Sequence, residues 1–236
     1  MVRRFDVIGF DADDTLWHSE DSFQRVERRF VEIVSPYAPE GVDVAAALRA
    51  MELAQLPISG YGVKAFTLSM VQSAVASTDG AITASAIAQI VETGMAMLTE
   101  TPRLLPHVPQ VLEDVGHDHR LVLITKGDLV HQSRKVRTSG LAHHFEQIDV
   151  VLEKDVETYA GIIDRLGVDP TRFCMVGNSV RSDVLPVLAL GAHAVHIPYP
   201  LLWGWEHVDH DEDVDELTSI ADLPARLRRP HHPSEV

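Results

Sequence analysis

The chain has 236 residues, of which 45% are hydrophobic and 23% charged, a composition typical of a soluble globular protein. Its formal net charge is −15 with histidine neutral. Such a surface repels nucleic acid and anionic membranes, so we expect neither as a partner, and any anion site has to be built locally from amides, a lysine or a metal ion.

The N-terminus and the cysteine content favour a cytoplasmic protein. Met1 leads through two arginines into a short apolar run that holds Asp6, which is not the pattern of a signal peptide. The single cysteine, Cys174, excludes an internal disulfide and suits a reducing compartment. It falls in an apolar run and is expected to be a small core residue. No stretch approaches the ~20 apolar residues needed to cross a bilayer.

The first predicted element is a buried strand over residues 5–10, whose apolar residues show little helical spacing. It ends in a cluster of three carboxylates, Asp11, Asp13 and Asp14. Like charges this close raise one another's pKa, so the cluster needs cations to stay ionised. Asp11 and Asp13 would share a face of an extended segment. Asp14 is expected to brace the loop through hydrogen bonds.

Residues 18–102 have helical spacing and no clear strand. Apolar residues recur at intervals of three or four positions in three stretches: Phe23, Val26, Phe30 and Ile33; Val63, Phe66, Met70 and Ala74; Ile87, Ile90, Val91 and Leu98. Breaks rich in proline or glycine separate the stretches, and about four helices are expected. Tyr61 and Lys64, beside one break, are candidates for the substrate side.

From Pro102 onward, strands alternate with helices. Strands are predicted at 121–124, 148–152, 173–176 and 194–197, and helices at 129–139, 156–166 and 180–190. A glycine follows each of these helices, as is common at helix ends. The alternation favours an α/β fold with a doubly wound parallel sheet. We expect an α/β core from residues 1–17 and 103–236, with an all-helical insert, residues 18–102, after the first strand.

Ligands of open parallel sheets bind at the carboxyl ends of the strands, so the residues there form the candidate site. The second strand ends in a hydroxyl and in amides expected to be free at a helix start, which makes an anion site. The third ends in a lone lysine, and the fourth in two oxygen ligands. These residues are Thr125, Lys126 and Gly127, then Lys154, then Asn178 and Asp183.

Together with Asp11 and Asp13, these residues supply a carboxylate nucleophile, a second carboxylate, a hydroxyl, a lysine and further oxygen ligands. Hard oxygen ligands beside a phosphate favour Mg2+ as the cofactor. A divalent cation and a lysine would also hold the neighbouring carboxylates in their ionised form.

Four motifs now stand in one order along residues 11–183: DADDT, the threonine of LITKG, the lysine of EKD, and GNSVRSD. A single DxD is a weak signal, but four motifs at predicted strand ends are a strong one. In these motifs the sequence resembles the haloacid dehalogenase superfamily, in its phosphatase branch with a helical cap after the first motif. The resemblance implies a Rossmann-like core.

The resemblance also implies roles for the acidic pair. Asp11 matches the nucleophile, which would form an aspartyl-phosphate. Asp13 matches the general acid/base, which would protonate the leaving alkoxide and then deprotonate the attacking water.

The other motifs would bind phosphate and metal. Thr125 and the amides of Lys126 and Gly127 would hold the phosphoryl oxygens, and Lys154 would pair with Asp11. Mg2+ would be held by Asp11, by the backbone carbonyl of Asp13 and by the fourth motif. That motif usually opens with Gly-Asp, and here reads Gly177-Asn178. Weaker Mg2+ binding is expected, and the direct ligand stays open between Asn178 and Asp183.

The expected function is Mg2+-dependent hydrolysis of a small phosphorylated metabolite, with the insert as a lid. Phosphoryl transfer to a second substrate, as in a mutase, and a non-catalytic binding protein that retains the fold are the alternatives. A C–halogen dehalogenase is disfavoured, because that branch uses no metal and does not need Asp13. A phosphonatase would need a Schiff-base lysine, for which Lys64 is the single candidate in the insert.

Thirteen histidines raise the alternative of a zinc site, with His117/His119 and His143/His144 as the nearest pairs. Neither pair has further cysteine or acidic ligands at metal spacing, so surface histidines near turns are the expectation.

Overall fold

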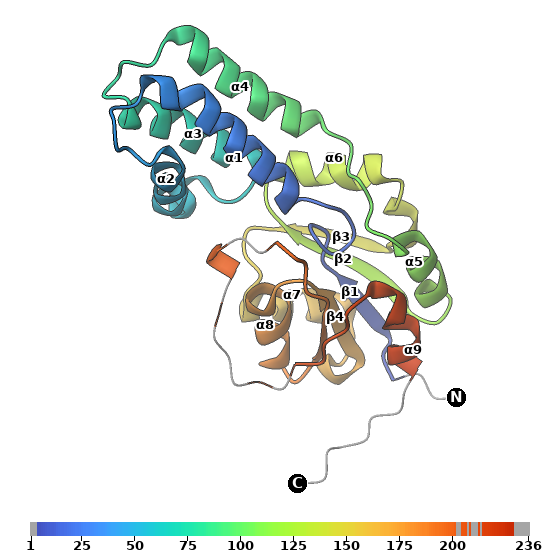
Figure 1. Cartoon of the computed structure of the whole chain (residues 1–236). Helices are drawn as coiled ribbons and strands as arrows, with labels where there is room; N and C mark the ends of the chain where they lie inside the picture. Colours follow the sequence, from blue (N-terminus) through green and yellow to red (C-terminus); the bar gives the residue numbers. More distant parts are fainter. Residues whose placement is uncertain (1–3, 202–203, 207, 209–211, 213, 229–236) are drawn as a thin grey trace.

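A five-stranded parallel sheet with strand order β3-β2-β1-β4-β5 forms the centre of the molecule (Figure 1). The computed structural model describes residues 4–201, 204–206, 208, 212 and 214–228. The strands are β1 (Val7–Phe10), β2 (Arg120–Lys126), β3 (Gln147–Val151), β4 (Phe173–Gly177) and β5 (His193–His196). The predicted doubly wound α/β fold is therefore confirmed, with strand bounds shifted by one or two residues.

Helices cover both faces of the sheet. They are α5 (Val108–Gly116), α6 (Leu129–Ser139), α7 (Val156–Leu166), α8 (Leu185–Leu188) and α9 (Leu223–Arg228). Because side chains alternate along a strand, Ile8 and Phe10 pack with α5, α6 and α9 on one face. Val7 packs with α7 and α8 on the other. Cys174 is buried in β4 and behaves as the predicted core residue; burial raises the pKa of its thiol to about 12.

The insert between β1 and β2 folds into four helices, α1 (Glu20–Val34), α2 (Val44–Ser59), α3 (Val63–Ser77) and α4 (Ala84–Thr99), and residues 18–102, all of them described, contain no strand. Phe30, Leu48, Met70 and Ile90 belong to an apolar cluster that these helices share. Figure 1 shows them packed together on one side of the sheet. No helix of the described residues is both long and apolar enough to span a membrane.

Two chain segments join the four helices to the sheet and run side by side. His18 N donates to Arg103 O at 3.0 Å, and Leu105 N donates to Leu16 O at 2.9 Å. These paired segments hold the start of α1 close to the carboxyl end of β1. Asp14, at φ 63°, accepts from Ser19 N at 2.8 Å and so braces this loop as predicted.

A close helix–helix contact depends on Gly94 in α4. A Cβ there would lie 2.1 Å from Thr67 Oγ1 of α3. We expect Gly94→Ala to lower the free energy of unfolding by about 1–3 kcal/mol, because overpacking forces the helices apart. Urea denaturation would measure this.

The matched control for Gly94 is Gly161→Ala in α7, where the nearest atom to the new Cβ is Arg165 Nη1 at 3.6 Å. That variant should be neutral or more stable by up to ~1 kcal/mol, as alanine favours helix. Thr67→Ala should restore part of the stability of Gly94→Ala. Equal losses for Gly94→Ala and Gly161→Ala would contradict the contact.

The helix predicted at 180–190 is wrong in its first half. Residues Val180–Val184 form a π-helical turn before the short α8. Pro186 has no amide to donate to Ser182 O. Instead, Leu185 N donates to Val180 O, and Ser182 O accepts from the Tyr159 hydroxyl at 3.1 Å.

Candidate active site

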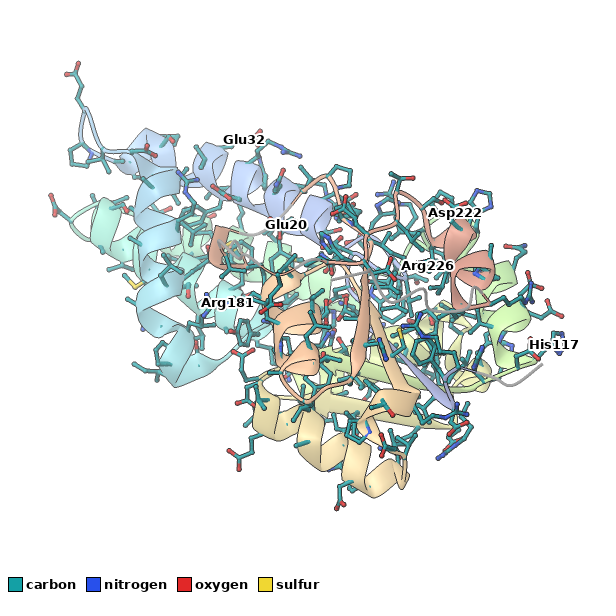
Figure 2. All side chains as sticks on the ribbon, turned by 90° about the horizontal axis from the view of Figure 1, so that it is seen from below. Glu20, Glu32, His117, Arg181, Asp222 and Arg226 are labelled. Atoms are coloured by element: carbon teal, nitrogen blue, oxygen red, sulfur yellow. The ribbon has the colours of Figure 1, made fainter. Side chains whose placement is uncertain are left out.

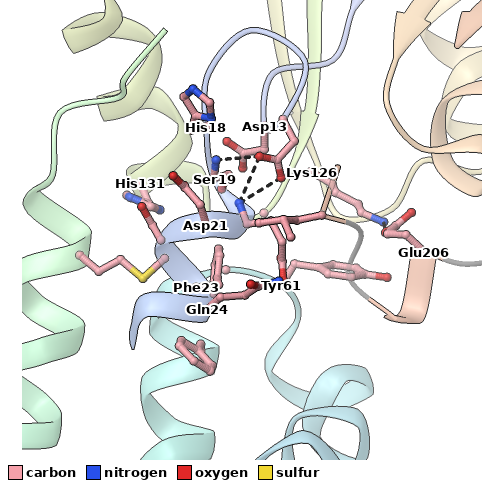
Figure 3. Close-up of a pocket in the computed structure, with 18 of the residues that line it drawn as sticks. Asp13, His18, Ser19, Asp21, Phe23, Gln24, Tyr61, Lys126, His131 and Glu206 are labelled. Atoms are coloured by element: carbon pink, nitrogen blue, oxygen red, sulfur yellow. Dashed lines mark hydrogen bonds and ion pairs between the residues drawn. The ribbon is translucent and has the colours of Figure 1, made fainter. Parts of the chain in front are cut away.

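All eight residues predicted from the four motifs line one cavity of about 1190 Å³. They are Asp11, Asp13, Thr125, Lys126, Gly127, Lys154, Asn178 and Asp183. The cavity opens at the carboxyl ends of the central strands and continues along α1 and α2 (Figure 3). It includes the switch point between β1 and β4, where ligands of such sheets bind.

Asp11 is at the centre of the site and is 6% exposed. One carboxylate oxygen, Oδ1, accepts from Lys154 Nζ. The other, Oδ2, accepts from Thr15 Oγ1 at 3.0 Å. Burial raises the pKa of Asp11 to about 7; Lys154 opposes this rise and the nearby Asp183 adds to it. The ionised form of Asp11 therefore depends on positive charge beside it.

Lys154, in the loop between β3 and α7, bridges two buried carboxylates. Its Nζ donates to Asp11 Oδ1 and, at 2.7 Å, to Asp183 Oδ1. Burial lowers the pKa of Lys154, but the two carboxylates outweigh burial and hold it well above its ordinary value. The lysine is charged at any working pH.

Asp183 has both oxygens engaged, because Oδ2 accepts from Ser179 N at 3.0 Å while Oδ1 binds Lys154. A Cβ on Gly177 would lie 2.2 Å from Asp183 Oδ2. The glycine of the fourth motif is thus required for this close approach, and Asp183 anchors Lys154.

Asn178 faces Asp11. Its amide terminus lies 3.2 Å from the Asp13 carbonyl oxygen and 3.3 Å from Asp11 Oδ2. With nitrogen inward, the amide donates hydrogen bonds to both; with oxygen inward, three oxygen atoms converge, as a hard cation requires. The described residues contain no group of three or more His, Cys, Asp or Glu side chains suited to a metal. A cation here would therefore need the Asp13 carbonyl and the Asn178 amide oxygen in addition to Asp11 Oδ2. This set of three oxygen donors fits Mg2+.

Asp13 accepts from three side chains that the sequence analysis missed. Trp17 Nε1 donates at 2.5 Å, Gln132 Nε2 at 3.1 Å, and Lys135 Nζ also donates. Burial raises the pKa of Asp13, but Lys135, Trp17 and Gln132 outweigh burial and hold it below its ordinary value. The sequence held a clue to two of these contacts, because Gln132 and Lys135 are polar residues three positions apart on the buried face of α6.

The Gly127 amide is not free, which corrects one part of the predicted anion site. Strand β2 continues through Thr125 to Lys126, and Gly127 N donates to Val151 O at 3.3 Å. Helix α6 begins at Leu129, as predicted, with Asp128 as its N-cap. The Thr125 hydroxyl does reach the cavity and accepts from Gln132 Nε2 at 2.7 Å.

The Lys126 side chain is held by a buried polar cluster. Its Nζ donates to Ser182 Oγ at 2.9 Å and to Glu206, and lies 4.4 Å from the centre of the Tyr61 ring (Figure 3). Glu206 also accepts from Ser179 Oγ at 2.5 Å. Burial raises the pKa of Glu206, but Lys126 outweighs burial and lowers it. Glu206 lies in no motif, and no sequence pattern pointed to it.

The two candidates from the insert have different positions. Tyr61 lines the cavity, and its hydroxyl donates to Glu153 Oε2 at 2.6 Å. Lys64 does not line the cavity; it forms an exposed ion pair with Asp128 at 2.9 Å. His117 lies at one end of the molecule, well away from Glu20 of the cavity (Figure 2).

Comparison with known proteins identifies the family. The model of the haloacid dehalogenase-like hydrolases matches residues 5–191. A haloacid dehalogenase-like hydrolase from Xanthomonas campestris is 40% identical, with a TM-score of 0.87 over 96% of this chain and 91% of that one. A 2-haloacid dehalogenase from Pseudomonas syringae shares the fold at 20% identity, with a TM-score of 0.66 over 94% of this chain and 98% of that one.

A curated relative carries a phosphatase name. The glyceraldehyde 3-phosphate phosphatase of Methanothermobacter thermautotrophicus is 27% identical over 129 residues, which are 51% of this chain and 57% of that protein. The match thus spans little more than half of either length. Since the family model covers most of the chain and includes all four strand-end motifs, the chain belongs to the haloacid dehalogenase-like hydrolases.

Proposed function

We propose that the chain is a Mg2+-dependent phosphatase that hydrolyses a small phosphorylated metabolite through an aspartyl-phosphate. The observation that carries this proposal is the environment of Asp11. One of its oxygens binds Lys154, and the other lies 3.3 Å from the Asn178 amide, which also lies 3.2 Å from the Asp13 carbonyl oxygen. A carboxylate between a lysine and a site suited to Mg2+ is arranged to attack phosphorus and to tolerate the charge of a phosphate.

The reaction has two balanced steps. In the first, an Asp11 carboxylate oxygen bonds to phosphorus, the ester P–O bond breaks, and Asp13 gives its proton to the leaving alkoxide. In the second, Asp13 takes a proton from water, the water oxygen bonds to phosphorus, and the bond between phosphorus and the Asp11 oxygen breaks, which regenerates the Asp11 carboxylate and frees inorganic phosphate. Lys154 balances the phosphoryl charge in both. The lowered pKa of Asp13 suits its role as a base. Lys135 contributes to that lowering, so to act as an acid Asp13 has to give up its hydrogen bond with Lys135 and donate a proton to the leaving oxygen.

Mg2+ would be held by three oxygen atoms: Asp11 Oδ2, the Asp13 carbonyl oxygen and the Asn178 amide oxygen. Both oxygens of Asp183 are engaged by Lys154 and Ser179 N, which favours Asn178 over Asp183 as the direct ligand. When bound, Mg2+ would neutralise phosphoryl charge and orient the substrate.

We further propose that residues 18–102 are a cap over the site, and that the protein acts in the cytoplasm on small molecules rather than on nucleic acid or membranes. The cavity is lined by both the four helices and the sheet, which supports a substrate enclosed between them. The name of the curated phosphatase relative supports a small phosphorylated substrate.

The decisive assay measures phosphate release from p-nitrophenyl phosphate and a panel of phosphorylated metabolites, with Mg2+ and with a chelator. Mg2+-dependent release is expected. Chloride release from 2-chloropropionate without phosphate release would replace the proposal by a dehalogenase. Transfer of the phosphoryl group to an added sugar phosphate, without free phosphate, would identify a phosphotransferase.

Asn178→Asp is expected to lower the Mg2+ concentration for half-maximal activity by about 10-fold, because it adds a charge beside the cation. Asn178→Ala should raise that concentration, because it removes an oxygen ligand. Activity titrations and the Mg2+-induced change in Tm would both measure the effect. Superimposable curves for the three proteins would remove Asn178 from the metal site.

A further inference from the structure

Gln132, on the buried face of α6, connects three parts of the site through one nitrogen. Its two hydrogens point to Thr125 Oγ1 at 2.7 Å and to Asp13 Oδ2 at 3.1 Å, and the longer contact to Lys126 O at 3.3 Å shares one of them. Gln132 is 2% exposed. Its side chain also packs against the backbone after β2, since a Cβ on Gly127 would meet Gln132 Cγ at 3.4 Å.

The neighbours of Gln132 determine which way its amide points. A backbone carbonyl such as Lys126 O can only accept a hydrogen bond. The terminal atom of Gln132 that faces Lys126 O must therefore be the nitrogen. The same nitrogen faces Thr125 Oγ1, so the threonine hydroxyl has to accept from Gln132.

This direction leaves the Thr125 hydrogen free for a ligand. A hydroxyl has one hydrogen and two lone pairs. The bond from Gln132 uses a lone pair, and among the described residues no contact of Thr125 Oγ1 takes its hydrogen. Thr125 is 1% exposed yet lines the cavity. Its O–H is thus a buried donor directed by elimination toward the cavity, where an anion can accept it.

We propose that Gln132 is a positioning residue that turns the Thr125 hydroxyl into an obligatory donor to the phosphoryl group. This inference rests on the proposed phosphatase function. In this role Gln132 acts through Thr125, and its second hydrogen holds Asp13 in the same network. Phosphate binding is thereby tied to the position of the acid/base side chain.

The test compares two substitutions of the same side chain. Gln132→Glu is nearly isosteric but accepts hydrogen bonds, so it captures the Thr125 hydrogen. Gln132→Met removes the bond and leaves the hydroxyl free to rotate toward the ligand. The affinity for inorganic phosphate, measured by calorimetry and by inhibition of p-nitrophenyl phosphate hydrolysis, should fall about 10–100-fold in Gln132→Glu and much less in Gln132→Met.

Two controls separate this effect from added charge and from misfolding. Gln110→Glu adds the same charge at an exposed position of α5 and should leave phosphate affinity unchanged. In the Thr125→Val background, where no hydroxyl remains, Gln132→Glu should lose most of its effect. If Gln132→Glu does not fold, Gln132→Met serves in its place: its smaller loss should also vanish in Thr125→Val.

The outcomes distinguish this inference from the proposed function. Equal losses for Gln132→Glu in the wild-type and Thr125→Val backgrounds would overturn the role of Gln132, since only repulsion would then operate. Wild-type hydrolysis together with unchanged phosphate affinity in both Gln132 variants would overturn the inference alone. A wild-type protein that neither binds phosphate nor hydrolyses phosphate esters would overturn both.

Discussion

Replacing Asp11 by Asn is expected to lower kcat for phosphate-ester hydrolysis by on the order of 10⁴-fold or more. The amide has nearly the same shape as the carboxylate but cannot attack phosphorus. The fold should persist, because Asp183 still pairs with Lys154. Burial raises the pKa of Asp11 to about 7, so the ionised group is costly and its neutral replacement should not lower Tm.

The intermediate provides a second measurement for this variant. Acid quench of the working wild-type enzyme should trap a phosphorylated protein, detectable by mass spectrometry, and Asp11→Asn should yield none. Asp6→Asn is the matched control, since Asp6 is an exposed partner of Arg172 outside the cavity. Turnover of Asp11→Asn at the rate of Asp6→Asn would exclude the aspartyl-phosphate mechanism.

Lys154→Met is expected to lower the free energy of unfolding by about 3–5 kcal/mol and to abolish activity. The lysine is 3% exposed, and it donates to two carboxylates that are themselves buried, Asp11 and Asp183. Without it, both carboxylates lose the cation that balances them. Urea denaturation and circular dichroism would measure the loss.

The cost of Lys154→Met should grow with pH. Burial raises the pKa of Asp11 from 3.8 to about 7 while Lys154 opposes the rise, so without the lysine the pKa of Asp11 rises further. Below pH 3.8 the carboxyl is protonated in both folded and unfolded chains and the substitution costs little there. Above pH 3.8, Asp11 of the unfolded chain releases its proton before Asp11 of the folded chain does. The free energy of unfolding therefore falls as the pH rises, until the pH passes the pKa of Asp11 in the folded chain. The difference from wild type should be larger at pH 9 than at pH 5.

A double variant separates charge from packing at this position. Lys154→Met combined with Asp183→Asn removes one cation and one anion, and should recover part of the lost stability without recovering activity. If the double variant is less stable than Lys154→Met, the unpaired carboxylates are not the cause of the destabilisation.

Local pattern in the sequence was enough to predict the layers of the fold. Apolar runs followed by helices that end in glycine indicated the parallel sheet, and three-to-four spacing indicated the helices of the insert. The site positions at strand ends followed from the same reading, because every parallel strand presents its carboxyl end at one edge of the sheet. Asp11, Thr125, Lys154 and Asp183 were therefore predicted to lie near one cavity, and they line it.

The tertiary structure decided which groups each of these residues contacts. Gln132 and Lys135 are more than a hundred positions from Asp13, and Glu206 comes after the last strand, so no spacing along the chain indicates their contacts. Local backbone changes mattered too: β2 runs two residues further than its apolar run, and residues 180–184 form a π-helical turn where a regular helix start was predicted. The sequence by itself determined which chemical groups reach the edge of the sheet, because that depends on local periodicity. Their partners depend on side-chain directions and packing across the sheet, which exist only in the folded chain.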